Sequence, residues 1–309
     1  MPNEKSRLTG KLLYFCSRIA HNTPVITHSY NHIHLQLAAI TLWLLCVVGA
    51  YGQTTGHPRF SLTVSNGSGY GEVRDLGTSP RVYDNLSLRQ GLEFNAETVG
   101  WLFSGRFGVS GALNTSKIKY LLKKGSYSGY SGSVDIAISA LRQVWCNGES
   151  TWSIAVGGGL SNHTYIGYTP KFMNASFALT DLFQPDFQVM VQYNLPNSNP
   201  LVVMPGWFAA FASVTVSPIG IAYRPGYSFI DNYTDGREVK NYIFNTYRTT
   251  FAWLPQLTAE LGVRFNLRSG NRILLAYMWN YRSSHGTADW QFDEVNHLLS
   301  IELNILLKK

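Results

Sequence analysis

The sequence predicts an all-β fold: an antiparallel transmembrane β-barrel of about 12 strands (roughly 10–14), preceded by a cleaved signal segment. Three observations support this prediction. Long segments alternate apolar and polar residues, short turns alternate with longer polar connections, and the chain begins with an export segment. Successive side chains of a strand point to opposite faces, so the alternation gives each strand one apolar face and one polar face.

The start of the chain has the parts of a signal segment. A basic stretch, an apolar run and small residues at the −3 and −1 positions of a cleavage site follow one another: Lys5, Arg7, Lys11 and Arg18, then residues 35–48, then Ala50-Tyr51-Gly52 before Gln53. The apolar run is shorter than the ~20 residues of a membrane-spanning helix, which favours cleavage over a retained anchor. We therefore expect a leader over residues 1–52 and one β-barrel domain over residues 53–309.

The net charge bears on a nucleic-acid partner, and the cysteine content bears on disulfide bonds. The formal net charge of +7 falls to about +4 when the leader, with four basic residues and one acidic residue, is removed. So small an excess gives no support to a nucleic-acid partner. Cys146 is the one cysteine after residue 52, so we expect no intramolecular disulfide in the mature chain.

The clearest element is a hairpin near the C-terminus. In residues 257–268 every odd-numbered residue is apolar and every even-numbered residue is polar or Gly. Ser269-Gly270-Asn271 supplies a tight turn, because Gly and Asn tolerate positive φ. The return strand, residues 273–281, presents Ile273, Leu275, Tyr277, Trp279 and Tyr281 on one face, and each strand is long enough to cross a bilayer at a tilt. The same pattern predicts further strands at 60–65, 86–95, 99–110, 134–139, 152–161, 187–194 and 299–307.

Connection lengths support a barrel in an outer membrane, where long loops lie outside and short turns lie in the periplasm. Long polar connections are expected at 66–84, 112–131 and 162–185, and short turns at 96–98 and 147–149. Pro218 interrupts the apolar segment 206–224, and it marks either a turn between two strands or a kink in one strand. An even strand count with both termini in the periplasm favours the turn, which gives the count of 12. That count places the long connection 225–240 on the periplasmic side, which does not fit the pattern of short periplasmic turns.

The two faces distinguish a barrel from a soluble β-sandwich. Aromatic residues lie near the ends of the apolar faces, as in the interfacial girdles of membrane barrels: Trp101, Tyr193, Tyr223, Trp279 and Tyr281. The polar faces combine small residues with isolated charges, which suits a crowded lumen. We therefore favour the barrel, and a ligand-binding sandwich is the alternative.

The chain resembles the small outer-membrane barrel proteins of Bacteroidetes-type bacteria, many of which have unknown function. The resemblance rests on the start at Gln53 after Ala50-Tyr51-Gly52, the rhythm of strands and loops, and the closing strand 298–307. It implies an outer-membrane location and transfers no active site. The chain departs from many outer-membrane barrels at its last residues, because Leu307-Lys308-Lys309 replaces a terminal aromatic residue.

Charges on the polar faces are the candidate functional residues. We expect them to line the lumen, where they either pair across strands and hold the barrel rigid or leave a polar path for solutes: Arg89, Glu93, Arg106, Asp135, Glu260, Arg264 and Glu302. His, Cys and carboxylate residues show no metal-ligand spacing, so we expect neither a metal site nor a cofactor.

Three other features receive structural interpretations. His163 and His285 invite comparison with outer-membrane phospholipases, which place a His and a Ser two residues apart on one strand, but Tyr165 and Thr287 stand in the Ser position. We interpret both as loop histidines and expect no catalytic residues. Residues 67–71 resemble a nucleotide-binding loop only superficially, and we expect a flexible loop there. Basic residues between 117 and 124 are expected at a loop tip, where lipopolysaccharide phosphates are an alternative role.

The sequence therefore predicts a non-enzymatic outer-membrane barrel, acting as a narrow channel or as a structural component of the bacterial envelope. The expected partners are membrane lipid and lipopolysaccharide, with other envelope proteins in second place. An outer-membrane lipid-modifying enzyme and a soluble, secreted β-sandwich binding protein are the alternatives.

Overall fold

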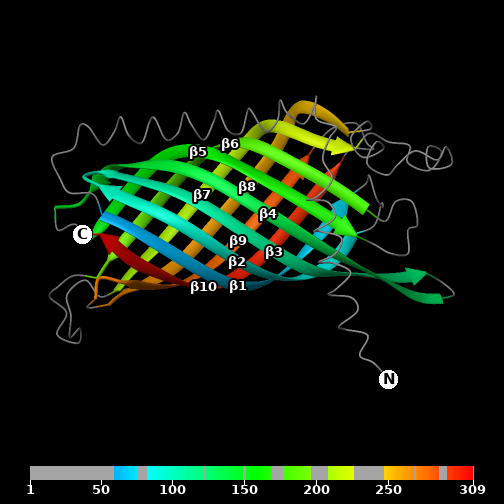
Figure 1. The fold of residues 1–309 in the computed structure, drawn as a ribbon, viewed down its shortest axis with the longest axis horizontal. Coiled ribbons are helices and arrows are strands. Elements are labelled where there is room, and N and C mark those ends of the chain that lie inside the picture. Colours follow the sequence, from blue (N-terminus) through cyan, green and yellow to red (C-terminus); the bar gives the residue numbers. More distant parts are fainter. Residues whose placement is uncertain are drawn as a thin grey trace, which may run out of the picture.

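Ten antiparallel strands form a closed barrel in the computed structural model (Figure 1). The structure describes residues 59–75, 82–120, 123–148, 151–168, 177–195, 208–225, 247–267, 269–284 and 291–308. The strands are β1 (Arg59–Asp75), β2 (Val82–Thr98), β3 (Trp101–Tyr120), β4 (Lys123–Cys146), β5 (Trp152–Tyr168), β6 (Phe177–Asn194), β7 (Phe208–Pro225), β8 (Tyr247–Asn266), β9 (Arg272–Ser284) and β10 (Phe292–Lys308). Each strand pairs with its neighbours in sequence, and β10 pairs with β1 to close the ring. The predicted leader, residues 1–52, lies outside the described residues.

The barrel has two distinct ends. We call the end where β1 begins and β10 finishes the near end, and the opposite end the far end. Residues 99–100, 147–151, 195–207 and 267–271 connect strands at the near end. Residues 76–81, 121–122, 169–176, 226–246 and 285–291 connect them at the far end.

Several strands are longer than the sequence predicts. β3 and β4 pair as far as Tyr120 and Lys123, so the predicted long loop 112–131 is wrong. The predicted loop 66–84 is also largely strand, because residues 67–71 lie within β1 and pair with both β2 and β10. Polar and Gly-rich stretches interrupt the apolar alternation, but backbone pairing continues through them because it does not depend on apolar side chains.

The strand count of ten corrects the predicted count of 12. Pro218 lies inside β7 rather than in a turn, and Pro185 and Pro255 lie inside β6 and β8. The β6–β7 register shifts between Phe183 and Phe187, and the β7–β8 register shifts between Ser217 and Ile219. Proline is tolerated at such irregularities because it has no N–H to donate to a regular ladder. We call this region of Pro185, Pro218 and Pro255 the proline seam.

Side chains compensate for the interrupted pairing at the proline seam. Gln184 Nε2 donates to the backbone oxygen of Leu254 at 2.5 Å, and the Ser217 hydroxyl donates to the carboxylate of Asp186. Gln184, Ser217 and Leu254 are all buried. Because β7 is one strand, the long connection 226–246 lies at the far end with the other loops, which removes the misfit of the 12-strand prediction.

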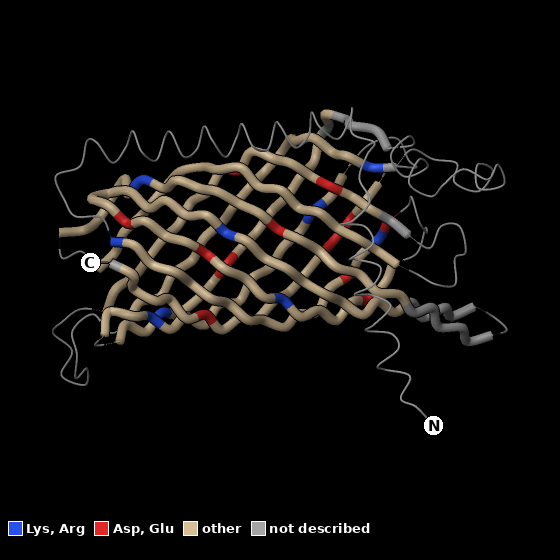
Figure 2. The backbone as a smooth tube through the Cα atoms, in the orientation of Figure 1, with Lys and Arg blue, Asp and Glu red and all other residues tan. Residues whose placement is uncertain are grey.

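The outward face of the barrel wall is apolar and the inward face is polar, which is the reverse of a soluble protein. Large apolar side chains point outward, with exposed fractions of 68% for Leu88, 58% for Leu261 and 64% for Ile301. The buried residues are mostly polar or charged, and the charges lie along the strands between the two ends (Figure 2). The predicted hairpin is confirmed: β8 and β9 pair from Gln256–Arg282 to Asn266–Arg272, and Gly270 in the turn has φ +87°.

Aromatic residues ring the near end of the wall. Trp152 and Tyr193 have ring centroids 4.7 Å apart on β5 and β6, and Phe208 and Phe265 have centroids 5.6 Å apart on β7 and β8. Similar pairs join Trp101 to Phe103 and Phe60 to Phe94. Such a ring is typical of the place where a membrane barrel meets the lipid headgroups. Among the described residues, no helix has the length and apolar character to cross a membrane.

Candidate functional site

A cavity of about 440 Å³ occupies the lumen. Its walls include Thr98, Gly100 and Trp101, so it reaches the near end of the barrel. All seven charged residues that the sequence singles out line this cavity: Arg89, Glu93, Arg106, Asp135, Glu260, Arg264 and Glu302. The structure groups them with further charges into three layers, which we call the near, middle and far layers.

The far layer is a set of charges that meet across the barrel. Arg282 on β9 places Nη2 3.0 Å from Asp135 Oδ1 and Nη1 3.1 Å from Glu294 Oε2. His163 contacts the same two carboxylates, with Nδ1 2.7 Å from Asp135 and Nε2 3.3 Å from Glu294. Two basic side chains therefore bridge one pair of carboxylates. We call Asp135, His163, Arg282 and Glu294 the clasp.

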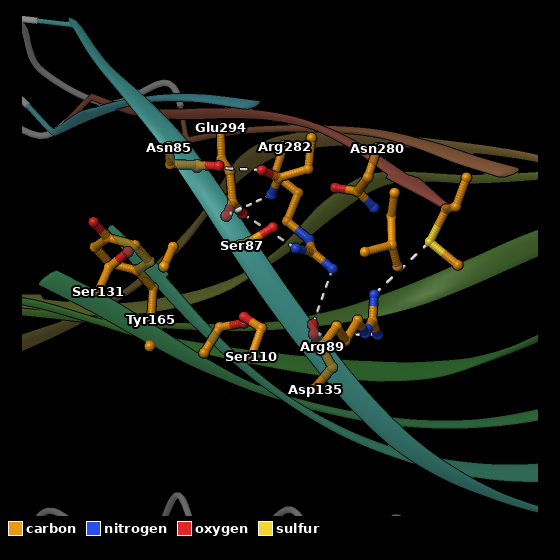
Figure 3. Close-up of a pocket in the computed structure, with 16 residues that line it drawn as sticks. Asn85, Ser87, Arg89, Ser110, Ser131, Asp135, Tyr165, Asn280, Arg282 and Glu294 are labelled. Carbon is orange, nitrogen blue, oxygen red and sulfur yellow. Dashed lines mark hydrogen bonds and ion pairs between the residues drawn. The ribbon is translucent and has the colours of Figure 1, made fainter. Parts of the chain in front are cut away.

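The clasp spans the full width of the lumen. Asp135 and His163 lie on β4 and β5, whereas Arg282 and Glu294 lie on β9 and β10, on the opposite side of the ten-strand ring. Two neighbours hold it in place. Arg89 Nη2 lies 3.3 Å from Asp135 Oδ2, and Arg282 Nε donates to Gln256 Oε1 at 3.2 Å. Figure 3 shows Arg282 between the two carboxylates, with Arg89 beside Asp135.

A second closure lies nearer the far end. Tyr165 and Phe292 pack with ring centroids 5.2 Å apart, and the Arg224 guanidinium lies 5.6 Å from the Phe292 ring centroid while pairing with Asp75. Phe292 is fully buried. These residues belong to a buried apolar cluster, the far plug: Val73, Tyr83, Tyr165, Leu182, Ala222, Leu254 and Phe292.

A small cavity of about 40 Å³ lies between the clasp and the far plug, with room for a few water molecules. Tyr165 of the far plug lines it, and so do Arg89, Asp135 and Arg282, which line the large cavity as well. The Asp135–Arg282 contact, drawn as a dashed line in Figure 3, therefore lies between the two cavities.

The middle layer has more acidic than basic groups. Arg106 Nε lies 2.9 Å from Glu93 Oε2, and the two residues are paired neighbours on β3 and β2. Glu302 accepts a hydrogen bond from the Ser300 hydroxyl at 3.1 Å. Glu260 on β8 makes no hydrogen bond or ion pair with the described part of the chain. Three carboxylates thus share one guanidinium in this layer.

The near layer has the opposite balance. Arg272 binds Glu97 through two contacts, at 2.6 Å and 3.2 Å. Arg59 donates to the backbone oxygen of Gly270 at 2.7 Å. Arg264 lines the cavity, and it makes no ion pair with any residue that the structure describes. The entrance therefore carries three guanidinium groups and one carboxylate.

Sequence reasoning missed three members of the clasp. The interpretation of His163 as a loop histidine is wrong, because it is buried within β5 directly opposite Asp135 on β4. Arg282 continues the inward register of the predicted strand 273–281 by one residue. Glu294 continues that of β10, eight residues before Glu302. Extending each strand by its period of two would have found both residues.

Other predicted features fall in different places. His285 and the side chains of Lys117, Lys119, Lys123 and Lys124 lie outside the described residues. Cys146 is exposed at the end of β4. In the described ranges, no group of His, Cys, Asp and Glu could hold a metal ion. His163 contacts carboxylates with both ring nitrogens, and no serine hydroxyl of the described strands contacts it.

No family model matches the chain, and neither does any curated protein sequence. Similar solved structures include the outer membrane protease OmpT from Escherichia coli, with a TM-score of 0.46 and 7% identity over 81% of this chain and 96% of that chain. The translocator domain of the autotransporter NalP from Neisseria meningitidis has a TM-score of 0.36 and 11% identity, covering 90% and 97%. The attachment invasion locus protein Ail of Yersinia pestis has a TM-score of 0.28 and 9% identity, covering 79% and 98%. At these identities the likeness concerns the barrel fold alone.

Proposed function

We propose that the chain is a non-enzymatic outer-membrane β-barrel protein, a structural component of the bacterial envelope whose lumen is closed at rest. The observation that carries the closed lumen is the contact between Asp135 and Arg282, from strands on opposite sides of the ring. An open channel of this width would need a continuous polar path, and the clasp and the far plug both lie across that path.

The outer surface supports a membrane location. Apolar side chains cover the outward face of most strands, and the aromatic ring at the near end is placed where an interface would lie. The near end holds both ends of the barrel, and the longest connection, residues 226–246, lies at the far end, so on this proposal the near end faces the periplasm. Lipid and lipopolysaccharide contact the outward face, other envelope proteins meet the connections, and neither nucleic acid nor a cofactor takes part. We also propose that the chain is related to the small outer-membrane barrel proteins of Bacteroidetes-type bacteria.

The non-enzymatic role is supported by how His163 is used. A Ser–His nucleophile needs the two side chains within hydrogen-bond reach. In the described strands His163 instead contacts Asp135 and Glu294, and both contacts belong to the clasp. Phospholipid turnover by the purified protein would overturn this role if turnover is lost in His163→Gln while the heat-modifiable migration of the folded barrel is retained.

Conductance in planar bilayers tests the closed lumen. We expect no steady current through the wild-type protein. In the double variant Arg282→Ala, Phe292→Ala, which shortens one side chain of each closure, we expect discrete current steps. Heat-modifiable migration of the variant on a gel shows that the barrel is intact. Steady wild-type current that is unchanged in the double variant would contradict the proposal and favour the narrow-channel alternative.

A further inference from the structure

The large lumen cavity has the size of a small-molecule site. Its volume of about 440 Å³ falls within the range of roughly 300–1,000 Å³ that such sites occupy. The clasp closes it on the far side, and Thr98, Gly100 and Trp101 line it at the near end. If the lumen is closed as proposed above, a solute can enter from the near end alone and must leave by the same route.

The charges on the cavity wall are sorted by depth. On the wall, the near layer has Arg264 and Arg272 against Glu97, whereas the middle layer has three carboxylates against Arg106. A simple anion is attracted by the arginines of the near layer but repelled by the carboxylates of the middle layer. A simple cation is repelled by the arginines of the near layer before it reaches those carboxylates. A solute with an anionic group at its outer end and a cationic group at its inner end matches both layers.

Two charged residues on β8 are available to hold such a solute. Glu260 and Arg264 lie on the same face of the strand, four residues apart, and both line the cavity. Among the described residues neither has an ion-pair partner, although their neighbours Glu97, Arg272, Glu93 and Arg106 are all paired. A charged group held away from water is stabilised by an opposite charge with good hydrogen-bond geometry.

The spacing of these residues limits the length of the solute. Four residues of strand separate their Cα atoms by about 13 Å. An extended tripeptide places its terminal ammonium and carboxylate roughly 10 Å apart. The two side chains extend into the lumen and can take up the remaining distance.

We propose that the lumen binds a dipolar solute of about tripeptide length from the near end. Its anionic group contacts Arg264 and its cationic group contacts Glu260, with Glu302 beside it. This proposal rests on the closed lumen proposed above, which makes the cavity a blind site.

Isothermal titration of the purified full-length barrel with trialanine tests the proposal. We expect saturable binding with a dissociation constant below about 1 mM. N-acetylated trialanine and trialanine amide, each lacking one terminal charge, should bind at least tenfold more weakly. The exposed residue Arg142 on β4 provides the matched control, and Arg142→Gln should leave all three affinities unchanged.

Variants of Arg264 and Glu260 test which end of the peptide each residue contacts. Arg264→Gln should bind trialanine and its amide equally, because the partner of the carboxylate is gone, and should still prefer the free amine over the acetylated form. Glu260→Gln should show the reverse pattern. These selectivity changes are not expected from general misfolding. Absence of trialanine binding, or an Arg264→Gln protein that still prefers the free carboxylate, overturns the proposal. If either result is obtained and the wild-type protein conducts no current in planar bilayers, the binding site is overturned but the closed lumen is not. A steady wild-type current overturns the closed lumen itself.

Discussion

Asp135 and Arg282 are 147 residues apart in the chain, yet Arg282 Nη2 lies 3.0 Å from Asp135 Oδ1 in the middle of the barrel. Their strands, β4 and β9, stand on opposite sides of the ring, so the contact spans the lumen. His163 and Glu294 repeat the same connection beside it. Buried charge pairs give little net stability compared with apolar packing, but removal of one partner is strongly unfavourable. The clasp is therefore sensitive to single substitutions.

Arg282→Gln should destabilise the barrel by about 3–5 kcal/mol, because Asp135 and Glu294 would both lose the Arg282 guanidinium while they stay buried. The midpoint of urea unfolding in detergent, followed by the loss of heat-modifiable migration, measures the change. Arg142→Gln removes an exposed guanidinium from β4 and serves as the control, with an expected change within about 1 kcal/mol from its contact with the Trp101 ring. Equal midpoints for the two variants would contradict the role of the clasp.

Asp135→Asn should be less unfavourable when Arg282→Gln is already present. The two side chains contact each other, so their effects on the free energy of unfolding should be coupled by about 0.5–3 kcal/mol. A double-mutant cycle measures this coupling directly. Strict additivity of the two effects would show that the 3.0 Å contact does not form in the membrane.

Gly220→Ala should destabilise the barrel at the proline seam. A Cβ atom at Gly220 would lie 2.5 Å from the backbone oxygen of Phe183 and 2.6 Å from Gln184 Cγ, so the backbone or the buried Gln184 must shift. Overpacking of this kind is unfavourable by about 1–3 kcal/mol. Gly111→Ala on β3 is the matched control, because a Cβ atom there meets nothing within 4 Å. Urea midpoints that fall together in both variants would show that space at Gly220 is not limiting.

Gln184→Leu tests how the proline seam is held together. The substitution leaves the backbone oxygen of Leu254, beside Pro255, without its buried donor, which should be unfavourable by about 1–3 kcal/mol. Gln188→Leu is the control: Gln188 lies on the same strand and also lines the lumen, but its side chain makes no hydrogen bond with the described residues. We expect a lower unfolding midpoint for Gln184→Leu than for Gln188→Leu, and the reverse order would be inconsistent with this role.

The sequence predicts the barrel class, the two-faced hairpin and the inward charges because side-chain alternation is a local property of a strand. It does not predict the strand count correctly, because a Pro in an apolar segment indicates a turn. Whether Pro218 ends a strand depends on its neighbours, and here Pro185 and Pro255 lie at adjacent irregularities in β6 and β8. Those irregularities have no local signature.

The contacts within the clasp could not be predicted from the sequence for a different reason. The pairing of Glu93 with Arg106 joins adjacent strands and follows from a short turn. Asp135 and Arg282 meet because a ring of ten strands places β4 opposite β9, whereas a ring of 12 would place β4 opposite another strand. Contacts across a barrel therefore depend on the strand count, and an incorrect count hides every one of them.

Nitroxide labels at Leu261→Cys and Thr258→Cys, in a Cys146→Ser background, measure whether a lipid-facing wall surrounds a polar lumen. Leu261 points outward on β8, and Thr258 lines the lumen cavity on the same strand. In lipid bilayers the label at position 261 should collide frequently with oxygen, which concentrates in lipid, and rarely with a water-soluble nickel complex. The label at position 258 should be poorly accessible to oxygen. A label at position 261 that is more accessible to the nickel complex than to oxygen would contradict the account.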